Sequence, residues 1–476
     1  MKFVTKYLNK YKNMPVGAKA AAWYTICNLL QKGIMFIVVP IYTRMLTTSE
    51  YGTYTIFQSW KDIIIIFTTL NLYCGVFTRG LVKYEEDRNK YISSIQILST
   101  FVTIFVCTVL FLFYDVIYTV WQVDKKVFIL LFIYYLFSPS IQFWSVKQRV
   151  ENKYIKMVVV TVLLSLVTPI ISIGLLVMTN MRENALIYGY LLVQIAFGII
   201  FYIDNIAKGK LSIKFEYCKE ALKFNIPLIP HYLSLIVLNQ SDRIMIDNYC
   251  GKAEAGIYSL TYSVSQILNI FIAAINGSMV PWQYEKMKKN EYKIIGKVSN
   301  ILCIAIGICT ILIIAIGPEI IYILGGKEYA EAIWCIPPIV LGVYFTFCYG
   351  LFSTVEFYYG VTKFIAFAST VGAVLNVILN AIFIPIFGYI AAAYTTLVCY
   401  VMFTIAHYAI MRRVTKEKIY KIRDMVLMSG ILLVLQIAFT FSYYYAIIRA
   451  IMLAILLVVT FIKRNYFIDC IKSIRR

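Results

Sequence analysis

The sequence EYGTY at residues 50–54 recurs as EAGIY at residues 254–258, an offset of 204 residues (254 minus 50). Each copy lies between the first and second apolar segments of a set of six, so the three identities fall at equivalent places. Two halves of six helices both start from the same side of a membrane, which predicts a parallel repeat related by an axis along the membrane normal. This architecture is typical of alternating access, in which the two halves rock against each other.

The composition predicts an all-α polytopic membrane protein. The 476 residues are 61% hydrophobic and 14% charged, and the mean hydropathy is +0.76. A soluble domain would be about a quarter charged. Here the apolar residues form runs of roughly 20, the length that crosses a bilayer as a helix. Fourteen transmembrane helices are predicted, at residues 18–40, 52–78, 92–114, 127–146, 157–179, 185–206, 222–248, 255–281, 298–324, 329–352, 364–386, 389–411, 424–442 and 444–462.

The repeat and the helix count together predict the domain organisation. An N-terminal six-helix lobe spans residues 1–215, and a second six-helix lobe spans residues 216–415. Residues 416–476 hold two additional transmembrane helices and a tail. No soluble domain of useful size lies between the helices.

The lysines and arginines outside the spans predict the orientation. Thirty-five of them lie in the two termini and in the connections on the same side as the termini. Because short cytoplasmic loops carry an excess of basic residues, both termini are expected in the cytoplasm. The net charge of +21 therefore has a topological explanation, and a nucleic-acid partner is not expected. Six basic residues lie on the other side: Arg44, Lys125, Lys126, Arg182, Lys252 and Lys327.

Two predicted helices carry lysines near the middle of the membrane. Lys32 lies about 14 residues from the cytoplasmic end of the first span, roughly 21 Å deep, and Lys61 lies about 10 residues from the outer end of the second, roughly 15 Å deep. One interpretation is an internal ion pair of either lysine with Asp62. The other is a cationic lining for an anionic cargo, and both can hold because Asp62 neutralises only one lysine. The neighbouring polar residues of the first span are Asn28 and Gln31.

Two further sets of polar residues have comparable alternative interpretations. Arg79, at the cytoplasmic end of the second span, could receive the same anion first, or could serve topology and lipid headgroups. Tyr262, Gln266, Asn269 and Asn276 recur on one face of the predicted helix 255–281. That face could hydrogen-bond a hydroxyl-rich cargo, or it could bond neighbouring helices.

Depth matching groups a third set of residues. Asp242, Asn376, Asn380 and Thr396 all fall roughly 10–17 Å below the outer surface. One carboxylate, two amide oxygens and a hydroxyl form a candidate site for a hard cation, with sodium or a proton as the coupling ion and no firm metal site. The alternative is an ion pair of Asp242 with Arg243, with the asparagines bonding helices to one another.

Signals of enzyme chemistry are absent from the sequence. It contains no G-x-x-x-x-G-K-[ST], H-E-x-x-H or G-x-S-x-G motif, so neither an enzyme nor an organic cofactor is expected. The only histidines are His231 and His407, for which packing is favoured over proton coupling. The cysteines fall mostly within apolar runs and are expected to pack as small hydrophobic residues.

Four stretches resemble one family across nearly the whole chain. They are VVPIYTRMLTTSEYGTY (38–54), NIPLIPHYLSLIVLNQSDRIMID (225–247), AGIYSLTYSVSQIL (255–268) and LNVILNAIFIPIFGYIAAAYTT (375–396). The chain is similar here to polysaccharide-repeat flippases of the multidrug/oligosaccharidyl-lipid/polysaccharide (MOP) exporter superfamily. The resemblance implies a cargo of undecaprenyl-diphosphate-linked oligosaccharide, moved across the bacterial cytoplasmic membrane to the outer leaflet, with polysaccharide polymerase machinery as a further partner.

The resemblance also implies roles for particular residues. Two lobes would form a V around a cationic cavity in which Lys32 and Lys61 meet the diphosphate, and the last two helices would offer a groove for the lipid tail. In related flippases of lipid-linked cell-wall precursors, an acidic residue on helix 7, polar residues on helix 11 and a threonine on helix 12 bind a cation. By position these are Asp242, Asn376, Asn380 and Thr396. This chain departs from the pattern in having asparagine at both helix 11 positions and Arg243 beside Asp242.

The alternative function is a cation-coupled multidrug or other small-molecule exporter of the same superfamily. Such exporters have twelve spans and acidic cavities for cationic drugs. The two additional helices and the midplane lysines argue against this alternative.

Overall fold

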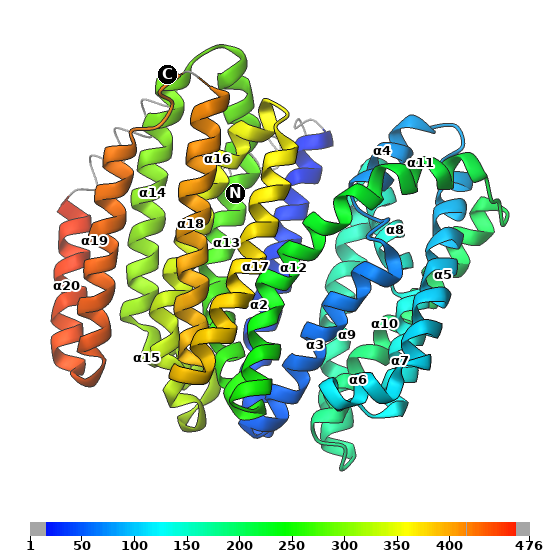
Figure 1. Cartoon of the computed structure of the whole chain (residues 1–476), viewed down its shortest axis with the longest axis horizontal. Coiled ribbons are helices and arrows are strands. Elements are labelled where there is room, and N and C mark those ends of the chain that lie inside the picture. Colours follow the sequence, from blue (N-terminus) through cyan, green and yellow to red (C-terminus); the bar gives the residue numbers. More distant parts are fainter. Residues whose placement is uncertain (1–15, 416, 463–476) are drawn as a thin grey trace, which may run out of the picture. The chain divides into compact units, whose positions relative to one another are not determined.

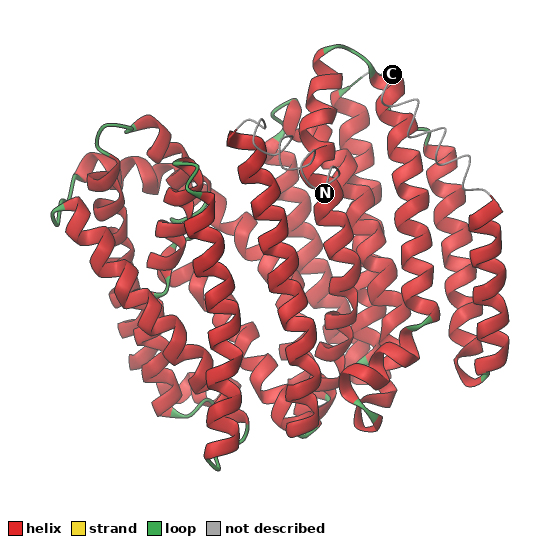
Figure 2. Ribbon diagram, turned by 180° about the vertical axis from the view of Figure 1, so that it is seen from behind, coloured by secondary structure: helices red, strands yellow, loops and turns green. Residues whose placement is uncertain are grey.

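The computed structural model describes residues 16–415 and 417–462, and this part of the chain consists of helices and loops without β-strands (Figures 1 and 2). Twelve helical segments there are long and apolar enough to cross a membrane. Of the two remaining predicted spans, α20 is a shorter apolar helix, and α3, which carries Lys61 and Asp62, is not among the twelve. The prediction of an all-α polytopic fold is confirmed. The basic residues at 1–15, 416 and 463–476, used for the predicted orientation, lie outside the described residues.

The helices occupy the following ranges: α2 (Val16–Met45), α3 (Thr48–Thr69), α4 (Gly75–Lys83), α5 (Arg88–Leu112), α6 (Tyr114–Trp121), α7 (Lys125–Phe137), α8 (Pro139–Val150), α9 (Tyr154–Met178), α10 (Glu183–Gly209), α11 (Phe215–Asn225), η1 (Ile226–Leu228), α12 (Ile229–Tyr249), α13 (Lys252–Lys288), α14 (Tyr292–Ala315), α15 (Gly317–Gly325), η2 (Lys327–Cys335), α16 (Ile336–Tyr358), α17 (Thr362–Phe387), α18 (Ile390–Val414), α19 (Ile422–Phe441), η3 (Ser442–Tyr444) and α20 (Ala446–Ile462).

Several predicted helices are broken in the structure. The fourth is divided at Ser138 into α7 and α8, and the ninth at Ile316 into α14 and α15. The second predicted span ends at Thr69, because Leu70 and Asn71 adopt positive φ angles of 46° and 54°, and α4 begins as a separate helix. The seventh is divided into α11, η1 and α12. Pro227 and Pro230 lie at this division, where a residue without a backbone N–H interrupts the helical hydrogen bonds. The short helix α6 lies in a connection for which no helix was predicted.

The chain forms two compact units that are discontinuous in sequence. The first comprises Met1–Val38 and Phe57–Gln240, and the second comprises Val39–Ile56 and Ser241–Arg476. In the first unit α10 packs against α5, α7, α8 and α9, and in the second α18 packs against α16 and α17 (Figure 1). The predicted domain boundaries at residues 215 and 415 follow the sequence repeat rather than packing, and they stay a prediction.

The two copies of the repeated sequence contact each other within the second unit. A Cβ atom added at Gly52 would lie 1.8 Å from the carbonyl oxygen of Lys252, and one added at Gly256 would lie 2.3 Å from that of Thr48. The glycines therefore allow α3 and α13 to cross with their backbones in contact. Gly52 and Gly256 are equivalent positions of the repeat, because they are 204 residues apart. The residues they approach, Thr48 and Lys252, are also 204 residues apart.

A hydrogen bond at the same crossing of α3 and α13 also joins equivalent positions of the two copies. The hydroxyl of Ser259 donates to the hydroxyl of Thr55 over 3.0 Å, and these residues are again 204 apart in sequence. Contacts between equivalent positions arise where two repeats meet across a two-fold axis. The crossing is thus a point at which the predicted symmetry of the repeat is visible in the packing.

The ion pair between Asp87 and Lys214 in the first unit predicts a pH window for stability. The carboxylate of Asp87 accepts hydrogen bonds from Lys214 Nζ at 2.6 Å and from Lys90 Nζ at 2.8 Å. These bonds, that from Lys214 foremost, hold the pKa of the Asp87 carboxyl well below its usual range, and the bond to Asp87 raises the pKa of Lys214. A lowered carboxyl pKa stabilises the fold above the unfolded pKa, and a raised lysine pKa stabilises it below the unfolded pKa.

We therefore expect Asp87→Asn to lower the melting temperature by a similar small amount between about pH 4 and pH 10, where both groups of the wild type are charged. The difference should shrink as the pH falls below about 4, as the wild-type carboxylate takes up its proton. Thermal unfolding of both proteins, from below pH 4 up to pH 10, measures this difference in melting temperature. A difference that grows on acidification would contradict the prediction.

Candidate functional site

The four residues grouped by depth lie together in the second unit. Asp242 lies on α12, Asn376 and Asn380 on α17, and Thr396 on α18, and the four side chains are buried. Asp242 Oδ1 accepts a hydrogen bond from Asn380 Nδ2 at 2.7 Å, and its Oδ2 accepts one from Thr396 Oγ1 at 2.9 Å. Asn376 Nδ2 donates to Thr396 Oγ1 over 3.0 Å. The geometry thus joins three helices through one carboxylate.

Two tyrosines and a second threonine complete this network. Tyr258 and Tyr262 of α13 donate to Asp242 Oδ2 at 2.6 Å and 3.3 Å, and Thr395 donates to Asn380 Oδ1. From the sequence, Tyr262 was assigned to a polar face, Tyr258 was not identified, and Thr396 rather than its neighbour Thr395 was placed in the site. Tyr258 precedes Tyr262 by four residues, so it lies on the same helix face, and this spacing was the available signal.

Arg243 contacts Ser259 and Tyr262 beside the Asp242 network. Its Nε donates to Ser259 Oγ at 3.1 Å, and its guanidinium lies 4.6 Å from the ring centroid of Tyr262. The same tyrosine therefore receives Arg243 on its ring and offers its hydroxyl to Asp242. Four neutral side chains hydrogen-bond the Asp242 carboxylate, so the network extends beyond a simple Asp242–Arg243 pair.

The chemistry of this donor set fits a monovalent hard cation. The oxygens of Asp242, Asn376, Asn380 and Thr396 are buried, and hard cations such as sodium prefer oxygen ligands. Each of these oxygens now takes part in a hydrogen bond with a side chain of the network, so a cation would replace the amide and hydroxyl hydrogens. A single carboxylate suits one positive charge. In the described part of the chain there is no cluster of three or more His, Cys, Asp or Glu residues that could hold a metal ion.

Lys61, in the first unit, is neutralised by neighbouring groups. Its Nζ lies 3.0 Å from Asp62 Oδ1, donates to the hydroxyl of Tyr190 at 3.0 Å, and lies 4.6 Å from the ring centroid of that tyrosine. The ring of Tyr134 lies 5.8 Å away. Lys61 is buried, and the hydroxyl of Tyr135 donates to its backbone carbonyl at 3.0 Å. The interpretation of Lys61 as half of an internal ion pair therefore matches its contacts.

Lys32 differs from Lys61 although both belong to the first unit. It lies near the middle of α2 and is half-buried. Among residues 16–415 and 417–462, its ammonium has no hydrogen bond or acidic partner. Asn28 on the same helix is exposed and Gln31 is half-buried, and neither makes a hydrogen bond within the described residues. The first unit thus contains one paired and one unpaired midspan lysine.

The remaining predicted cargo residues are more exposed. Arg79 lies 4.0 Å from Glu220, with its guanidinium 5.3 Å from the ring centroid of Phe224. On α13, Gln266 is exposed and Asn269 is half-buried. As far as the structure describes the chain, neither of these two amides hydrogen-bonds a neighbouring helix, which leaves both available to a ligand.

The two histidines have different surroundings. His407 of α18 is buried, with its Nδ1 2.9 Å from Glu356 Oε2, and it stacks on the ring of Tyr349. His231 is half-buried, with its ring centroid 5.9 Å from that of Tyr232. The sequence reasoning identified both histidines but missed the Glu356 partner, since the two residues are 51 positions apart.

Similarity to known proteins covers most of the chain. A family model described as "Polysaccharide biosynthesis protein" matches residues 18–287, more than half of the sequence. A curated relative from Haemophilus influenzae, named "Uncharacterized membrane protein", is 27% identical over 156 residues. That match covers 32% of this chain and 38% of the relative, so the aligned part is well under two thirds of that protein.

Solved structures share the fold at low sequence identity. The "Lipid II flippase MurJ, inward closed conformation" has a TM-score of 0.69 and 14% identity, and the match covers 93% of this chain and 99% of that chain. An inward-facing multidrug resistance MATE family transporter of the MOP superfamily has a TM-score of 0.57 and 11% identity, covering 83% and 96%. At these identities the likeness shows a common fold. The chain has the fold of membrane transporters of this superfamily.

Proposed function

We propose that this protein, which belongs to the polysaccharide biosynthesis protein family, is a flippase for undecaprenyl-diphosphate-linked oligosaccharide repeat units. It would move them by alternating access from the cytoplasmic to the outer leaflet, for surface polysaccharide synthesis. The proposed location is the bacterial cytoplasmic membrane, with both termini in the cytoplasm. The family and the transporter fold support this function.

The physical task of such a flippase is to carry a diphosphate through the membrane. The hydrocarbon layer is about 30 Å thick, and burying an isolated charge in it is prohibitively costly. A fixed cation at midspan replaces part of the hydration of the phosphates. Lysine binds phosphate as a point charge rather than as a bidentate clamp, which suits a cargo that must be released.

The observation that carries the proposal is the contrast between Lys32 and Lys61. A half-buried charge in the middle of a span is expensive unless it has a partner or faces water. Lys61 has Asp62 as its partner. Lys32 has none among the residues that the structure describes, so an anionic cargo is the counterion that we assign to it.

We further propose that the cluster around Asp242 holds the coupling cation, sodium or a proton. Asn376, Asn380 and Thr396 would supply neutral oxygens, and Asp242 would supply the balancing charge. A bound cation supplies a charge on which the membrane potential acts, worth about 2.3 kcal/mol per 100 mV. Without a cation, hydrogen bonds between these side chains link the three helices.

Substitution of Lys32 tests the proposed function. In a strain that lacks the wild-type gene, Lys32→Gln should reduce polysaccharide export about tenfold to a hundredfold, because a hydrogen bond to a charged group contributes roughly 1.5–3 kcal/mol. Lipid-linked oligosaccharide should accumulate at the same time, and mass spectrometry of the lipid extract measures it. Lys32→Arg should retain most of the export.

Two control variants separate cargo binding from ion pairing. Lys156→Gln removes an exposed lysine on α9 and should leave export unchanged. Lys61→Gln should impair export, and Lys61→Gln with Asp62→Asn should recover it, because the double change removes the ion pair as a unit. Normal export by Lys32→Gln would refute the assignment of Lys32. A strain without the protein that accumulates no lipid-linked sugar would refute the function.

A further inference from the structure

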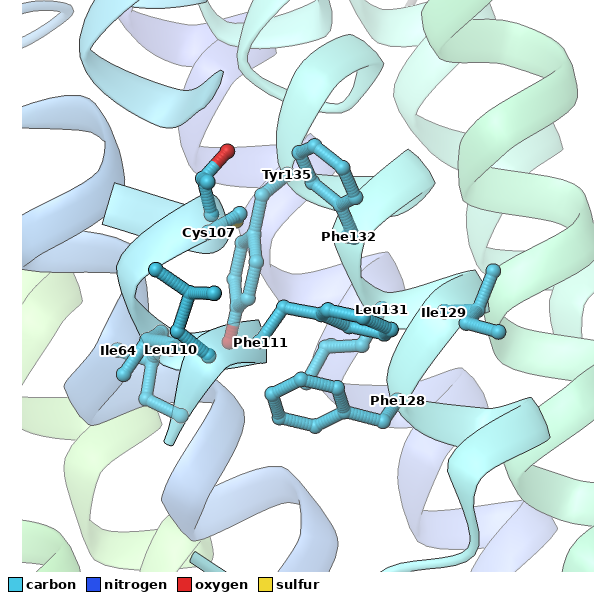
Figure 3. Close-up of a pocket in the computed structure, with 11 residues that line it drawn as sticks. Ile64, Cys107, Leu110, Phe111, Phe128, Ile129, Leu131, Phe132 and Tyr135 are labelled. Carbon is cyan, nitrogen blue, oxygen red and sulfur yellow. The ribbon is translucent and has the colours of Figure 1, made fainter. Parts of the chain in front are cut away.

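The first unit contains an apolar cavity of about 300 Å³ that the proposed function does not use. Its walls come from three helices: Ile64 of α3, five residues of α5 between Cys107 and Leu112, and five residues of α7 between Phe128 and Tyr135 (Figure 3). Leu131 and Tyr135 are each 2% exposed and form the buried wall. Figure 3 shows the rings of Phe111, Phe128, Phe132 and Tyr135 around one space. The cavity is therefore lined by aromatic and aliphatic groups.

The cavity opens on the apolar outer surface of the helices. The side chains at its rim are exposed, with Ile129 at 43%, Phe111 at 44% and Leu112 at 75%. On a membrane-spanning protein, an exposed apolar surface of this kind lies against lipid. The molecule available to fill the cavity from this direction is thus a lipid hydrocarbon chain.

The size of the cavity selects a single chain. At ~30 Å³ for a group the size of a water molecule, the volume holds about ten methylene groups, most of one acyl chain. A helix of a partner protein is about 10–12 Å across with its side chains and could not enter. The cavity suits one unbranched chain rather than a helix or a pair of chains.

One lysine stands beside the wall of the cavity, and a second lysine follows it in the sequence. Lys125 begins α7, and its Nζ lies 5.6 Å from the ring centroid of Phe111, which lines the cavity. Lys126 follows it, and both side chains are exposed. In the part of the chain that the structure describes, neither ammonium lies within ion-pair distance of a carboxylate. The neighbouring Asp124 instead accepts a hydrogen bond from the backbone N–H of Lys126 as the helix cap.

The position of these lysines is unusual for this chain. By the distribution of basic residues, Lys125 and Lys126 are two of only six lysines and arginines between the spans on the external side. Adjacent external lysines are therefore not explained by topology. The ammonium of Lys125 lies beside Phe111 at the rim, where the phosphate of an outer-leaflet lipid would be if its chain filled the cavity, and Lys126 is the next residue of the same helix.

We propose that this cavity binds an anionic phospholipid of the outer leaflet, with one acyl chain between α3, α5 and α7 and its phosphate at Lys125 and Lys126. The bound chain packs against Tyr135, whose hydroxyl holds the backbone carbonyl of Lys61. The lipid thereby supports the helix that carries the Lys61–Asp62 pair. This binding does not depend on which cargo the protein transports.

Native mass spectrometry of the purified, delipidated full-length protein tests the proposal. The probes are phosphatidylglycerol and phosphatidylcholine with identical acyl chains. The wild type should retain one phosphatidylglycerol more tightly than phosphatidylcholine. Lys125→Gln with Lys126→Gln should weaken phosphatidylglycerol binding roughly 30-fold, since each lysine near a lipid surface contributes about 1 kcal/mol, and should leave phosphatidylcholine unaffected. Lys327→Gln, an external lysine of the second unit, should change neither.

Filling the mouth of the cavity tests the position of the chain. Thr108→Phe, at an exposed position of the lining, should abolish retention of both lipids. Its melting temperature should be no lower than that of the Lys125→Gln, Lys126→Gln double variant. Ile129→Trp, at the rim, should do the same and serves if Thr108→Phe does not fold. Equal retention of the two lipids by the wild type would overturn the proposal. Undiminished lipid retention by Thr108→Phe and Ile129→Trp would also overturn it. A wild-type dimer that Thr108→Phe dissociates would likewise overturn it, because the cavity would then bind a second copy of the chain rather than a lipid.

Discussion

Replacing Gly52 or Gly256 by valine is expected to remove most of the folded protein from the membrane. The first atom of any side chain at Gly52 would lie 1.8 Å from the backbone carbonyl of Lys252, and at Gly256 it would lie 2.3 Å from that of Thr48. These neighbours are backbone atoms, so a rotamer change cannot relieve the clash. Overpacking of this kind costs about 1–3 kcal/mol or more, which predicts a loss of monodisperse protein of about fivefold or more after detergent extraction.

Size-exclusion chromatography of a fluorescent fusion measures this loss directly. Gly277→Val is the matched control, because Gly277 lies on the same helix α13 and has no atom within 4 Å of an added Cβ. It should behave as the wild type. If Gly52→Val and Gly277→Val gave equal yields, the close crossing of α3 and α13 would be wrong. Gly52→Val and Gly256→Val should each lower the yield of monodisperse protein, because each glycine lies against the backbone of the other helix.

The sequence identified these glycines as equivalent but could not show that they touch. Repetition of a motif reports a common ancestry of two segments, whereas contact depends on how the helices cross. The long apolar helices were predictable because the length of an apolar run is set by the thickness of the bilayer. The break at Leu70 and Asn71 was not, since neither glycine nor proline marks it and their positive φ angles arise in the tertiary structure.

The cluster around Asp242 shows which contacts can be predicted from helix geometry and which cannot. A rise of about 1.5 Å per residue fixes the depth of every side chain, so Asn380 and Thr396 could be matched to Asp242 before their contacts were known. Rotation about the helix axis is fixed only by packing. For that reason Tyr258 was not identified and Thr395 was left out of the site, and the choice of Lys61 over Lys32 as the partner of Asp62 could not be made from sequence. Tyr190, which also bonds Lys61, lies 129 residues away.

Removing the Asp242 carboxylate is expected to have the second large effect, on both stability and ion dependence. Tyr258, Asn380 and Thr396 would lose their acceptor in Asp242→Ala, and each buried donor left without a partner costs about 1–3 kcal/mol. Thermal unfolding should show a much lower melting temperature. Asp242→Asn keeps the shape of the side chain and one carbonyl oxygen as an acceptor, so its melting temperature should fall less than that of Asp242→Ala. In both variants the stabilisation by sodium that we expect of the wild type should be absent.

The ion dependence is measured by melting each protein in sodium chloride and in choline chloride at equal ionic strength. Asp204→Asn is the control for loss of a carboxylate, since Asp204 forms an exposed pair with Lys208 and should leave the sodium effect intact. A wild type whose melting temperature is the same in both salts would refute sodium binding but not the hydrogen-bond network. An Asp242→Ala variant as stable as the wild type would refute the network. A sodium effect that survives in Asp242→Asn would assign the cation to other residues, because a neutral amide cannot balance a buried positive charge.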